Sequence, residues 1–440
     1  MNYKPYTIKN LGSIPWLNRL SDAQLFNIRV VGSVLPFKTN NYVVNELINW
    51  DDFENDPMFI LNFPQKAMLA PDQFNTMATL LNSGASVEKT AMEANRIRLS
   101  LNPHPAGQMD KNVPMLDNKK VHGIQHKYRE TILFFPTQGQ TCHAYCTFCF
   151  RWPQFTGMEG QRFATKDADT MVRYVKAHPE VTDILFTGGD PMIMSAKLFS
   201  IYVNALLDAK ITTIKTIRIG TKTLSFWPYR YLTDRDSPEL LELFKKITDA
   251  GIHLSIMSHI NHPRELSTEA CERAISAIRK TGAVIRSQSP VLNKINAEAD
   301  IWSQMWKTQV NLGIVPYYMF VARNTGAQSY FSLPLVKAWK LYREAYSHVS
   351  GIARTVRGPS MSASPGKVKL DGITEINGKK VMILSFVQAR NPEWVKQPFF
   401  AEYDDKAIWL DQLRPAFGED KFFFDTPQPT VSDELSVMGG

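Results

Sequence analysis

The hydrophobic pattern of the chain changes character near residue 125. Before that point, apolar residues recur at helical spacing in the segments 22–31, 71–82 and 86–99. This spacing places apolar side chains on one face of a helix. A proline-rich connection follows at 102–114. We therefore expect residues 1–125 to form a helical cap.

From residue 132 onward, short apolar runs alternate with amphipathic stretches. The runs are rich in β-branched and aromatic residues and fall at 132–135, 184–186, 216–219, 254–257, 284–286 and 317–321. Helical spacing occupies the intervals at 167–178, 196–209, 238–250, 268–281 and 298–312. Such alternation predicts parallel βα units, so the expected fold class is α/β. Six units suit a partial (βα)6 barrel.

The same pattern predicts the remaining boundaries. We expect the barrel at 126–333, and a C-terminal extension of one helix followed by irregular structure at 334–424. The polar tail at 425–440 is expected to be disordered. In a barrel of parallel strands, the residues that carry chemistry gather at the carboxyl ends of the strands.

Composition narrows the class of protein. The chain has 440 residues, 44% of them hydrophobic, which is enough for one large core. We find no apolar run long enough to span a bilayer and no signal-peptide pattern at the N-terminus. Three of the four cysteines lie within eight residues, which is not a disulfide framework, so we expect a cytoplasmic protein. The net charge of +8 is spread along the chain, which favours an enzyme with anionic ligands over a nucleic-acid binder.

The strongest candidate for chemistry is the run TCHAYCTFCFRW, in which Cys142, Cys146 and Cys149 form C-x3-C-x2-C. One alternative is a zinc knuckle or an incidental buried trio. A zinc site, however, usually brings a second C-x2-C or a His pair at matching distance, which this sequence lacks. Three thiolates can instead hold three irons of a [4Fe-4S] cluster and leave the fourth iron open. An open iron can bind a small molecule through its amino and carboxylate groups.

Polar groups follow several of the predicted strands. After the second strand, FTGGDPMIM carries Gly188 and Gly189, which allow a tight turn with backbone N–H groups turned outward. The plain alternative is an ordinary βα turn. Further strand ends carry Arg218 and Gly220, then His259, Asn261 and His262, and then Gln288. Because these ends meet at one barrel mouth, they indicate a site rather than separate loop residues.

Taken in order, C-x3-C-x2-C-x-R, TGGDP, RIGTKT, H-x-NHPRE, RSQS and VPYYMF resemble the lysine 2,3-aminomutase family of radical S-adenosylmethionine (SAM) enzymes. The resemblance spans roughly residues 45–390. It implies that Cys142, Cys146 and Cys149 hold the cluster. It also implies that the following residues contact SAM: Phe148, Gly188, Gly189, Asp190, Arg218, His259 and Gln288.

The substrate side of the resemblance rests on Arg151, two residues after the last cysteine. It matches the arginine that grips the substrate carboxylate in the family, a role that a bidentate guanidinium can fill. The plain alternative is a surface arginine on the loop that leaves the cluster.

The chain departs from the family where pyridoxal phosphate (PLP) binds. The stretch VRGPSMSASPGKVKL allows two alignments. In one, Lys367 is the lysine that carries PLP. In the other, which matches more residues and which we favour, the glycine-rich PLP loop is deleted between Pro359 and Ser362. The family's phosphate-gripping arginine falls at Thr131, where Lys127 or Arg129 could substitute.

The substrate pocket departs from the family as well. Tyr128 keeps the aromatic residue of its stretch and is a candidate substrate contact. Arg323 and Arg357 stand where lysine-specific members use two aspartates. Two arginines around an ammonium would leave like charges unpaired, so lysine is a poor substrate candidate. An anionic group suits the pair better; the plain alternative is that both arginines face solvent or acidic neighbours.

Three hypotheses follow. The first is a radical SAM enzyme of aminomutase ancestry without PLP, acting on a small amino-acid-like carboxylate with a second anionic group. The second is a PLP-dependent 2,3-aminomutase for lysine or for an acidic amino acid such as glutamate. The third is a non-catalytic iron–sulfur protein, which would need a fourth cysteine ligand. The expected partners are a small-molecule substrate and a flavodoxin- or ferredoxin-type reductant, with a homo-oligomer as an open alternative and neither nucleic acid nor a membrane expected.

Overall fold

The computed structural model describes residues 1–158, 160 and 163–425, and its centre is one curved sheet. Of the tail expected at 425–440, only Asp425 lies within these residues. The sheet runs in the order β15-β14-β13-β12-β11-β10-β9-β8-β7-β6-β5. Its six central strands are parallel and follow the chain order: β6 (Thr131–Phe134), β7 (Asp183–Phe186), β8 (Thr216–Thr221), β9 (His253–His259), β10 (Val284–Val291) and β11 (Ile314–Val321).

Helices connect these strands along one face of the sheet, as the alternating pattern predicted. They are α6 (Ala168–Ala177), α7 (Ala196–Asp208), α9 (Ser237–Asp249), α10 (Glu269–Lys280) and α11 (Ala299–Asn311). Side-chain caps define where several begin: Asp167 accepts from Thr170 N–H at the start of α6, and Thr268 accepts from Cys271 N–H at the start of α10. Their apolar faces and the buried strand residues form the main hydrophobic core. The α/β partial barrel is therefore confirmed.

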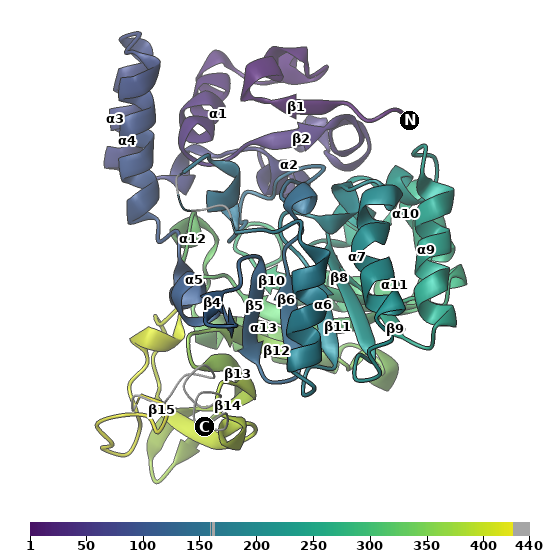
Figure 1. Cartoon of the computed structure of the whole chain (residues 1–440). Coiled ribbons are helices and arrows are strands. Elements are labelled where there is room, and N and C mark those ends of the chain that lie inside the picture. The colour runs from purple at the N-terminus through teal and green to yellow at the C-terminus, as the bar shows by residue number, and fades with distance from the viewer. Residues whose placement is uncertain (159, 161–162, 426–440) are drawn as a thin grey trace.

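The N-terminal part lies at the end of the sheet where the parallel strands finish (Figure 1). Its helices are α1 (Asp22–Val34), α2 (Pro57–Asn62), α3 (Pro71–Asn82) and α4 (Val87–Ser100). A short antiparallel pair, β1 (Pro5–Thr7) and β2 (Lys38–Asn40), was not expected. This region has its own core, which also takes in Ala144, Trp152 and the partly buried Cys146 and Phe148. The cap and the cysteine loop therefore share one hydrophobic cluster.

The connection between cap and barrel carries α5 (Gln108–Lys111), the pair β3 (Met115–Leu116) and β4 (Lys119–Lys120), and β5 (Ile124–Tyr128). β5 pairs antiparallel with β6 and forms one edge of the large sheet. Two short helices, α8 (Thr223–Phe226) and α12 (Gln328–Phe331), follow β8 and β11.

The C-terminal extension corrects one expectation. After the predicted helix, α13 (Leu335–Ser347), the chain is not irregular but adds β12 (Arg357–Ser362), β13 (Gly366–Ile376), β14 (Lys379–Ala389) and β15 (Pro398–Glu402). β12 is parallel to β11, whereas β13, β14 and β15 are antiparallel to their neighbours. A third hydrophobic cluster holds them against α13. The extension thus lengthens the barrel sheet rather than standing apart from it.

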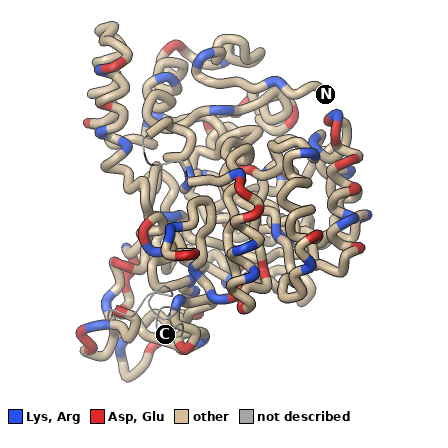
Figure 2. Tube along the Cα trace, viewed as in Figure 1, with Lys and Arg blue, Asp and Glu red and all other residues tan. Residues whose placement is uncertain are grey.

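Charged side chains of both signs are interspersed along the whole trace (Figure 2). Within the described residues, no helix is long and apolar enough to cross a membrane.

Candidate active site

The three cysteines lie on the loop between β6 and α6, at the carboxyl end of the first parallel strand. The N–H of Cys149 donates to the carbonyl of Cys146 at 3.0 Å, a tight turn that brings the last two thiols onto one side of the loop. All three are partly buried. Among the described residues, no three His, Cys, Asp or Glu side chains are gathered closely enough to hold a single metal ion. A [4Fe-4S] cluster asks for something different, since each thiolate binds its own iron.

Burial raises the pKa of each thiol in this loop, to about 11 for Cys149. Desolvation disfavours the thiolate, so three adjacent anions would not persist there alone. A cationic iron centre would supply the missing charge. The donor set and its surroundings therefore fit a [4Fe-4S] cluster.

The glycine turn after β7 packs directly against the cysteine loop. The N–H of Gly189 donates to the carbonyl of Gly139 at 3.0 Å, and the N–H of Asp190 donates to that of Thr141 at 2.8 Å. A Cβ on Gly189 would meet the backbone of Thr141 at 2.5 Å. The N–H of Gly189, which was expected to turn outward, thus points to this loop, as does the N–H of Asp190. The turn needs glycine because two backbones meet there.

Asp190 is buried and fully occupied by protein contacts. Its carboxylate accepts from the hydroxyls of Thr221 and Thr223 at 2.7 and 2.9 Å and from the N–H of Lys222 at 2.8 Å. Burial raises its pKa, against the lowering effect of these hydrogen bonds. Asp190 therefore fastens the glycine turn to the end of β8.

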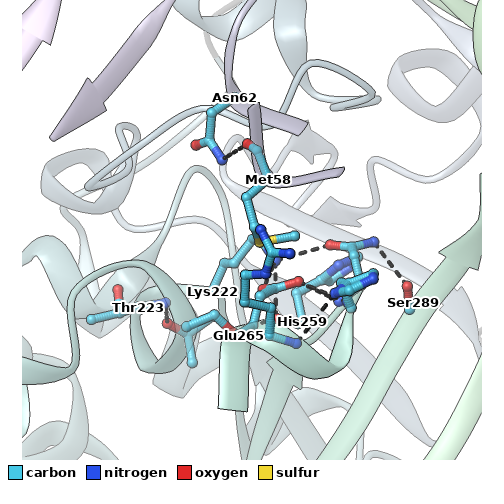
Figure 3. Close-up of polar contacts among 12 residues, drawn as sticks. Met58, Asn62, Lys222, Thr223, His259, Glu265 and Ser289 are labelled. Carbon is cyan, nitrogen blue, oxygen red and sulfur yellow. Dashed lines mark hydrogen bonds and ion pairs between the residues drawn. The ribbon is translucent and has the colours of Figure 1, made fainter. Parts of the chain in front are cut away.

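A second network fixes the end of β9. The Lys222 ammonium forms an ion pair with the buried Glu265 and donates to Asn261 Oδ1 at 2.9 Å. Asn261 in turn donates to Ser289 Oγ on β10 at 2.8 Å. Lys222, Glu265 and His259 lie together at this edge of the sheet (Figure 3). The network joins the ends of three strands and so sets the position of His259.

These strand ends open into a cavity of about 260 Å³. Every one of the six parallel strands contributes to its wall, which means that the sheet curves around it. Of the predicted residues, the cavity brings together Phe148, Arg151, Arg218, His259, Gln288, Tyr128, Arg323 and Lys367. It does not include Gly188, Gly189, Asp190 or Arg357 among its lining residues.

At the part of the cavity where SAM is expected, Phe148 and His259 present two uncharged rings. The ring of Phe148 stacks on that of His259 at 6.1 Å. Burial, followed by the nearby Lys222, lowers the pKa of His259 to about 3, so its imidazole is uncharged. Gln140 Oε1, beside the glycine turn, is buried without a hydrogen-bond partner among the described residues. An ammonium donor such as that of SAM would satisfy this oxygen, so the residues present fit SAM.

The lining of the cavity is rich in basic residues. Five basic residues line it, namely Lys127, Arg151, Arg218, Arg323 and Lys367. Among the residues that the structure describes, no Asp or Glu belongs to this lining. Only Arg218 has an acidic partner: its Nε donates to Asp183 Oδ1 at 2.8 Å. Four basic side chains therefore share one cavity without an acidic partner among the described residues, which favours an anionic ligand.

Arg151 stands between two aromatic rings. Its guanidinium lies 4.6 Å from the centroid of the Phe135 ring and 5.1 Å from that of Phe150. In residues 1–158, 160 and 163–425 it has neither a hydrogen-bond nor an ion-pair partner. Burial and the neighbouring Arg323 lower its pKa to about 10, at which it stays charged at neutral pH. The rings hold the guanidinium plane while its N–H groups remain free.

Arg323 also has no acidic partner among the described residues, and its guanidinium lies 4.8 Å from the centroid of the Phe150 ring, which Arg151 contacts as well. Its Nη2 donates to the Ser362 carbonyl at 3.0 Å, whereas its buried Nε is unpartnered within the described part of the chain. Lys127 from β5 donates to the Ala363 carbonyl at 2.5 Å. Burial first, and then the nearby cations Arg390 and Arg323, hold the pKa of Lys127 well below its usual range. Arg323 and Lys127 thus converge on the β12–β13 turn.

Lys367 comes from the start of β13. Its amine donates to Gln388 Oε1 at 3.1 Å and lies 4.2 Å from the centroid of the Tyr318 ring. Burial lowers the pKa of this amine to about 7. A buried amine near cationic side chains and Tyr128 also fits a phosphate-bearing aldehyde such as PLP. The cavity therefore accommodates either ligand chemistry.

Arg357 and Arg129 were the two other arginines expected near the ligand, and both are exposed. Arg357 reaches the hydroxyls of Tyr317 and Tyr318 at 3.4 and 3.5 Å from outside. The expected pairing of Arg323 with Arg357 is thus replaced by Arg323 with Lys127 and Lys367. Of the two substitutes considered for the phosphate arginine, only Lys127 lines the cavity.

Several contributors escaped the sequence analysis. Lys222 and Glu265 lie inside the motifs RIGTKT and H-x-NHPRE, so their charge within a strand-end motif was an available signal. Gln108 and Asn112 from the cap connection and Gln388 from β14 also line the cavity. No local pattern marks these three, because the long-range strand pairing brings them there.

Comparison with known proteins gives the same family in each curated relative considered. A protein of Aquifex aeolicus (strain VF5), provisionally named L-lysine 2,3-aminomutase, is 30% identical over 415 residues, which cover 94% of this chain and 97% of that protein. The L-lysine 2,3-aminomutase of Acetoanaerobium sticklandii is 27% identical over 257 residues, 58% of each chain. That of Escherichia coli (strain K12) is 28% identical over 251 residues, 57% of this chain and 69% of its own. No family model matches the chain.

Two solved structures align with part of the chain. A radical SAM methyltransferase from Sphaerobacter thermophilus aligns with a TM-score of 0.36 and 14% identity, over 57% of this chain and 72% of its own. Streptococcus suis SuiB bound to its precursor peptide SuiA aligns with a TM-score of 0.34 and 13% identity, over 66% and 62%.

Proposed function

Because the chain belongs to the lysine 2,3-aminomutase-like family of radical SAM enzymes, we propose that it removes a hydrogen atom from a small amino-acid-like substrate carrying a carboxylate and a second anionic group. As an aminomutase-like radical SAM enzyme it is not a non-catalytic iron–sulfur protein, the third hypothesis. The observation that carries the proposal is the cavity lining, in which four basic side chains have no acidic partner among the described residues.

Two cofactors complete the proposal. Cys142, Cys146 and Cys149 hold a [4Fe-4S] cluster, and Phe148, His259 and Gln288 face SAM across the cavity. When bound and reduced, the pair supplies a radical able to take a hydrogen atom from an unactivated carbon. The electron comes from a flavodoxin- or ferredoxin-type protein.

The protein's own residues bind and orient the substrate. Arg151 takes the carboxylate, because its free N–H groups and aromatic supports favour a bidentate anion. Arg323 and Lys127 take the second anionic group at the β12–β13 turn. Two fixed anchor points place one carbon toward SAM. The cap connection and β13 close the cavity around the substrate and keep water from the reacting carbon.

Arg323→Asp and Arg357→Asp form a matched pair of variants, because Arg323 lines the cavity and Arg357 does not. We expect Arg323→Asp to lower kcat/KM for the anionic substrate by about 10- to 100-fold. The new carboxylate would repel the anionic group of the substrate, and such a contact between like charges in a partly buried site costs several kcal/mol. Arg357→Asp, whose side chain is exposed, should change kcat/KM by less than about threefold. Steady-state kinetics with a dicarboxylic or phosphorylated amino acid measures both. Equal effects of the two variants would refute the second anion site at Arg323.

A second candidate function is a PLP-dependent 2,3-aminomutase with Lys367 as the PLP lysine. The position of this residue favours it, because a buried amine with a pKa of about 7 lines the cavity beside Lys127 and Tyr128. Sequence alignment favours the loss of the PLP loop instead. The two candidates share the radical chemistry and differ in what Lys367 does.

Anaerobic purification with added PLP separates the two candidates. The PLP-free enzyme is expected to show no visible absorption of lysine-bound PLP, while SAM is still cleaved under reduction. A band that disappears in Lys367→Ala but persists in Lys369→Ala, a lysine of the same strand that is ion-paired with Asp371, would establish the aminomutase instead.

A further inference from the structure

The N-terminal cap holds the cysteine loop by its backbone. The backbone carbonyl of Lys38, on β2, accepts a hydrogen bond from the N–H of Tyr145 at 2.7 Å. The N–H of Thr147 donates to the Leu61 carbonyl at 2.9 Å. Tyr3 OH donates to the His143 carbonyl at 2.7 Å. These contacts fix the loop in a position set by residues more than eighty positions away in the sequence.

Among these contacts, Lys38 alone brings a charge. Its ammonium donates to the carbonyl of Cys142 at 2.6 Å and lies 3.5 Å from Thr141 Oγ1. It also lies 5.7 Å from the centroid of the Tyr145 ring. No carboxylate of the described residues is within ion-pair distance of this ammonium. The chain therefore keeps a partly buried cation, without a countercharge, against the first cysteine of the loop.

Such a cation costs desolvation free energy unless it meets negative charge. The groups around the ammonium are the Cys142 carbonyl, the Thr141 hydroxyl and the Tyr145 ring, and they offset this desolvation cost only in part. A cluster held by three thiolates is anionic, and it becomes more so on reduction. The reduction potential of an iron–sulfur cluster rises with nearby positive charge and with hydrogen bonds to its ligands.

We propose that Lys38 raises the reduction potential of the cluster held by Cys142, Cys146 and Cys149, so that the cap controls how readily the enzyme is reduced. The inference rests on the proposed cluster. Lys38 acts as a positioning and charge-supplying residue rather than a catalytic one. The second contact group, Tyr3, supplies a hydrogen bond of the same kind to the neighbouring carbonyl without charge, which makes it the matched control.

The test is an anaerobic redox titration of the reconstituted protein, followed by the electron paramagnetic resonance signal of the reduced cluster. Four variants are compared with the wild-type protein: Lys38→Met, Lys38→Gln, Lys38→Arg and Tyr3→Phe. We expect the two neutral Lys38 variants to titrate at a more negative potential. At the wild-type midpoint, their reduced fraction should fall severalfold. Lys38→Arg and Tyr3→Phe should stay near the wild-type value.

The iron and sulfide content of each variant is measured as well, because it shows whether the cysteine loop still holds a cluster. If both neutral variants lose iron while Lys38→Arg and Tyr3→Phe keep it, the positive charge serves to retain the cluster and not to set its potential, which would overturn the proposal. Unchanged potentials in Lys38→Met or Lys38→Gln with full iron content would overturn the proposal. So would equal iron loss in Lys38→Arg and Tyr3→Phe, which indicates a structural clamp alone. A wild-type protein without any cluster would instead refute the proposed function.

Discussion

Replacing any one of Cys142, Cys146 and Cys149 by alanine is expected to abolish reductive cleavage of SAM. In the proposed cluster each thiol binds its own iron and no other cysteine could replace it, because the three lie on a single loop and the fourth cysteine, Cys271, is buried in α10. Substitution of residues that only support the metal ligands already lowers metal affinity or activity by roughly 10- to 100-fold. Loss of a ligand should therefore lower SAM cleavage by more than about 100-fold.

Iron and sulfide content and SAM turnover, measured together, check this prediction. Cys271→Ala is the matched control, since it removes a thiol of the same chemistry from a helix outside the site. It should keep the cluster and turnover within about twofold, allowing for the modest cost of a small buried side chain. A triad variant that retained full SAM cleavage would show that the three cysteines do not hold the cluster.

Arg151→Met is expected to lower kcat/KM for the substrate steeply while leaving the cluster intact. The guanidinium is the free cation nearest to the cysteine loop in sequence, and its aromatic supports fix its plane. Removing one partner of a buried charge pair costs about 2–5 kcal/mol, a fall in kcat/KM of roughly 30- to 4,000-fold. Arg151→Lys should recover only part of this loss, because an ammonium cannot form the bidentate pair.

The control for Arg151 is Arg129→Met, which removes an exposed arginine outside the cavity. Substrate-dependent and substrate-independent SAM cleavage should be measured in each variant. We expect Arg151→Met to retain the substrate-independent reaction and Arg129→Met to change neither. If Arg151→Met lost iron, or kept normal kcat/KM, the carboxylate would have to bind elsewhere.

The barrel could be predicted because its strands are short, mainly apolar runs. The runs at 184–186 and 254–257 are apolar apart from Ser255 and are separated by helices of clear 3.6-residue period. The carboxyl ends of those strands follow from the topology, so His259 and Gln288 could be expected at one mouth. Local pattern and long-range fold agree for these elements.

The C-terminal strands left a local signal that the sequence analysis did not use. β13 alternates Lys367, Lys369 and Asp371 with the buried Val368 and Leu370, which is the period-two pattern of a half-buried strand. Its place in the sheet depends on pairing with β12 and β14, which no local window reveals. For the same reason, the arrival of Lys367 in the cavity could not be read from the sequence.

The functional site, like the fold, could be predicted only in part from the sequence. Motif spacing located Arg151 and Arg323, but whether a side chain enters the cavity depends on its neighbours in space. Arg357 is the first residue of β12, two residues before a proline, and its side chain does not line the cavity. Lys127, from the antiparallel strand β5, does line it. The motif located the glycine turn, yet the N–H of Gly189 faces the cysteine loop because the Gly139 carbonyl lies within reach.

The most direct test of the account is the fate of SAM in the anaerobically reconstituted wild-type protein under a strong reductant. We predict that 5′-deoxyadenosine and methionine form in equal amounts, and that Cys146→Ala forms neither above background. A protein that carries a complete [4Fe-4S] cluster and binds SAM, yet yields no 5′-deoxyadenosine on reduction, would contradict the central claim.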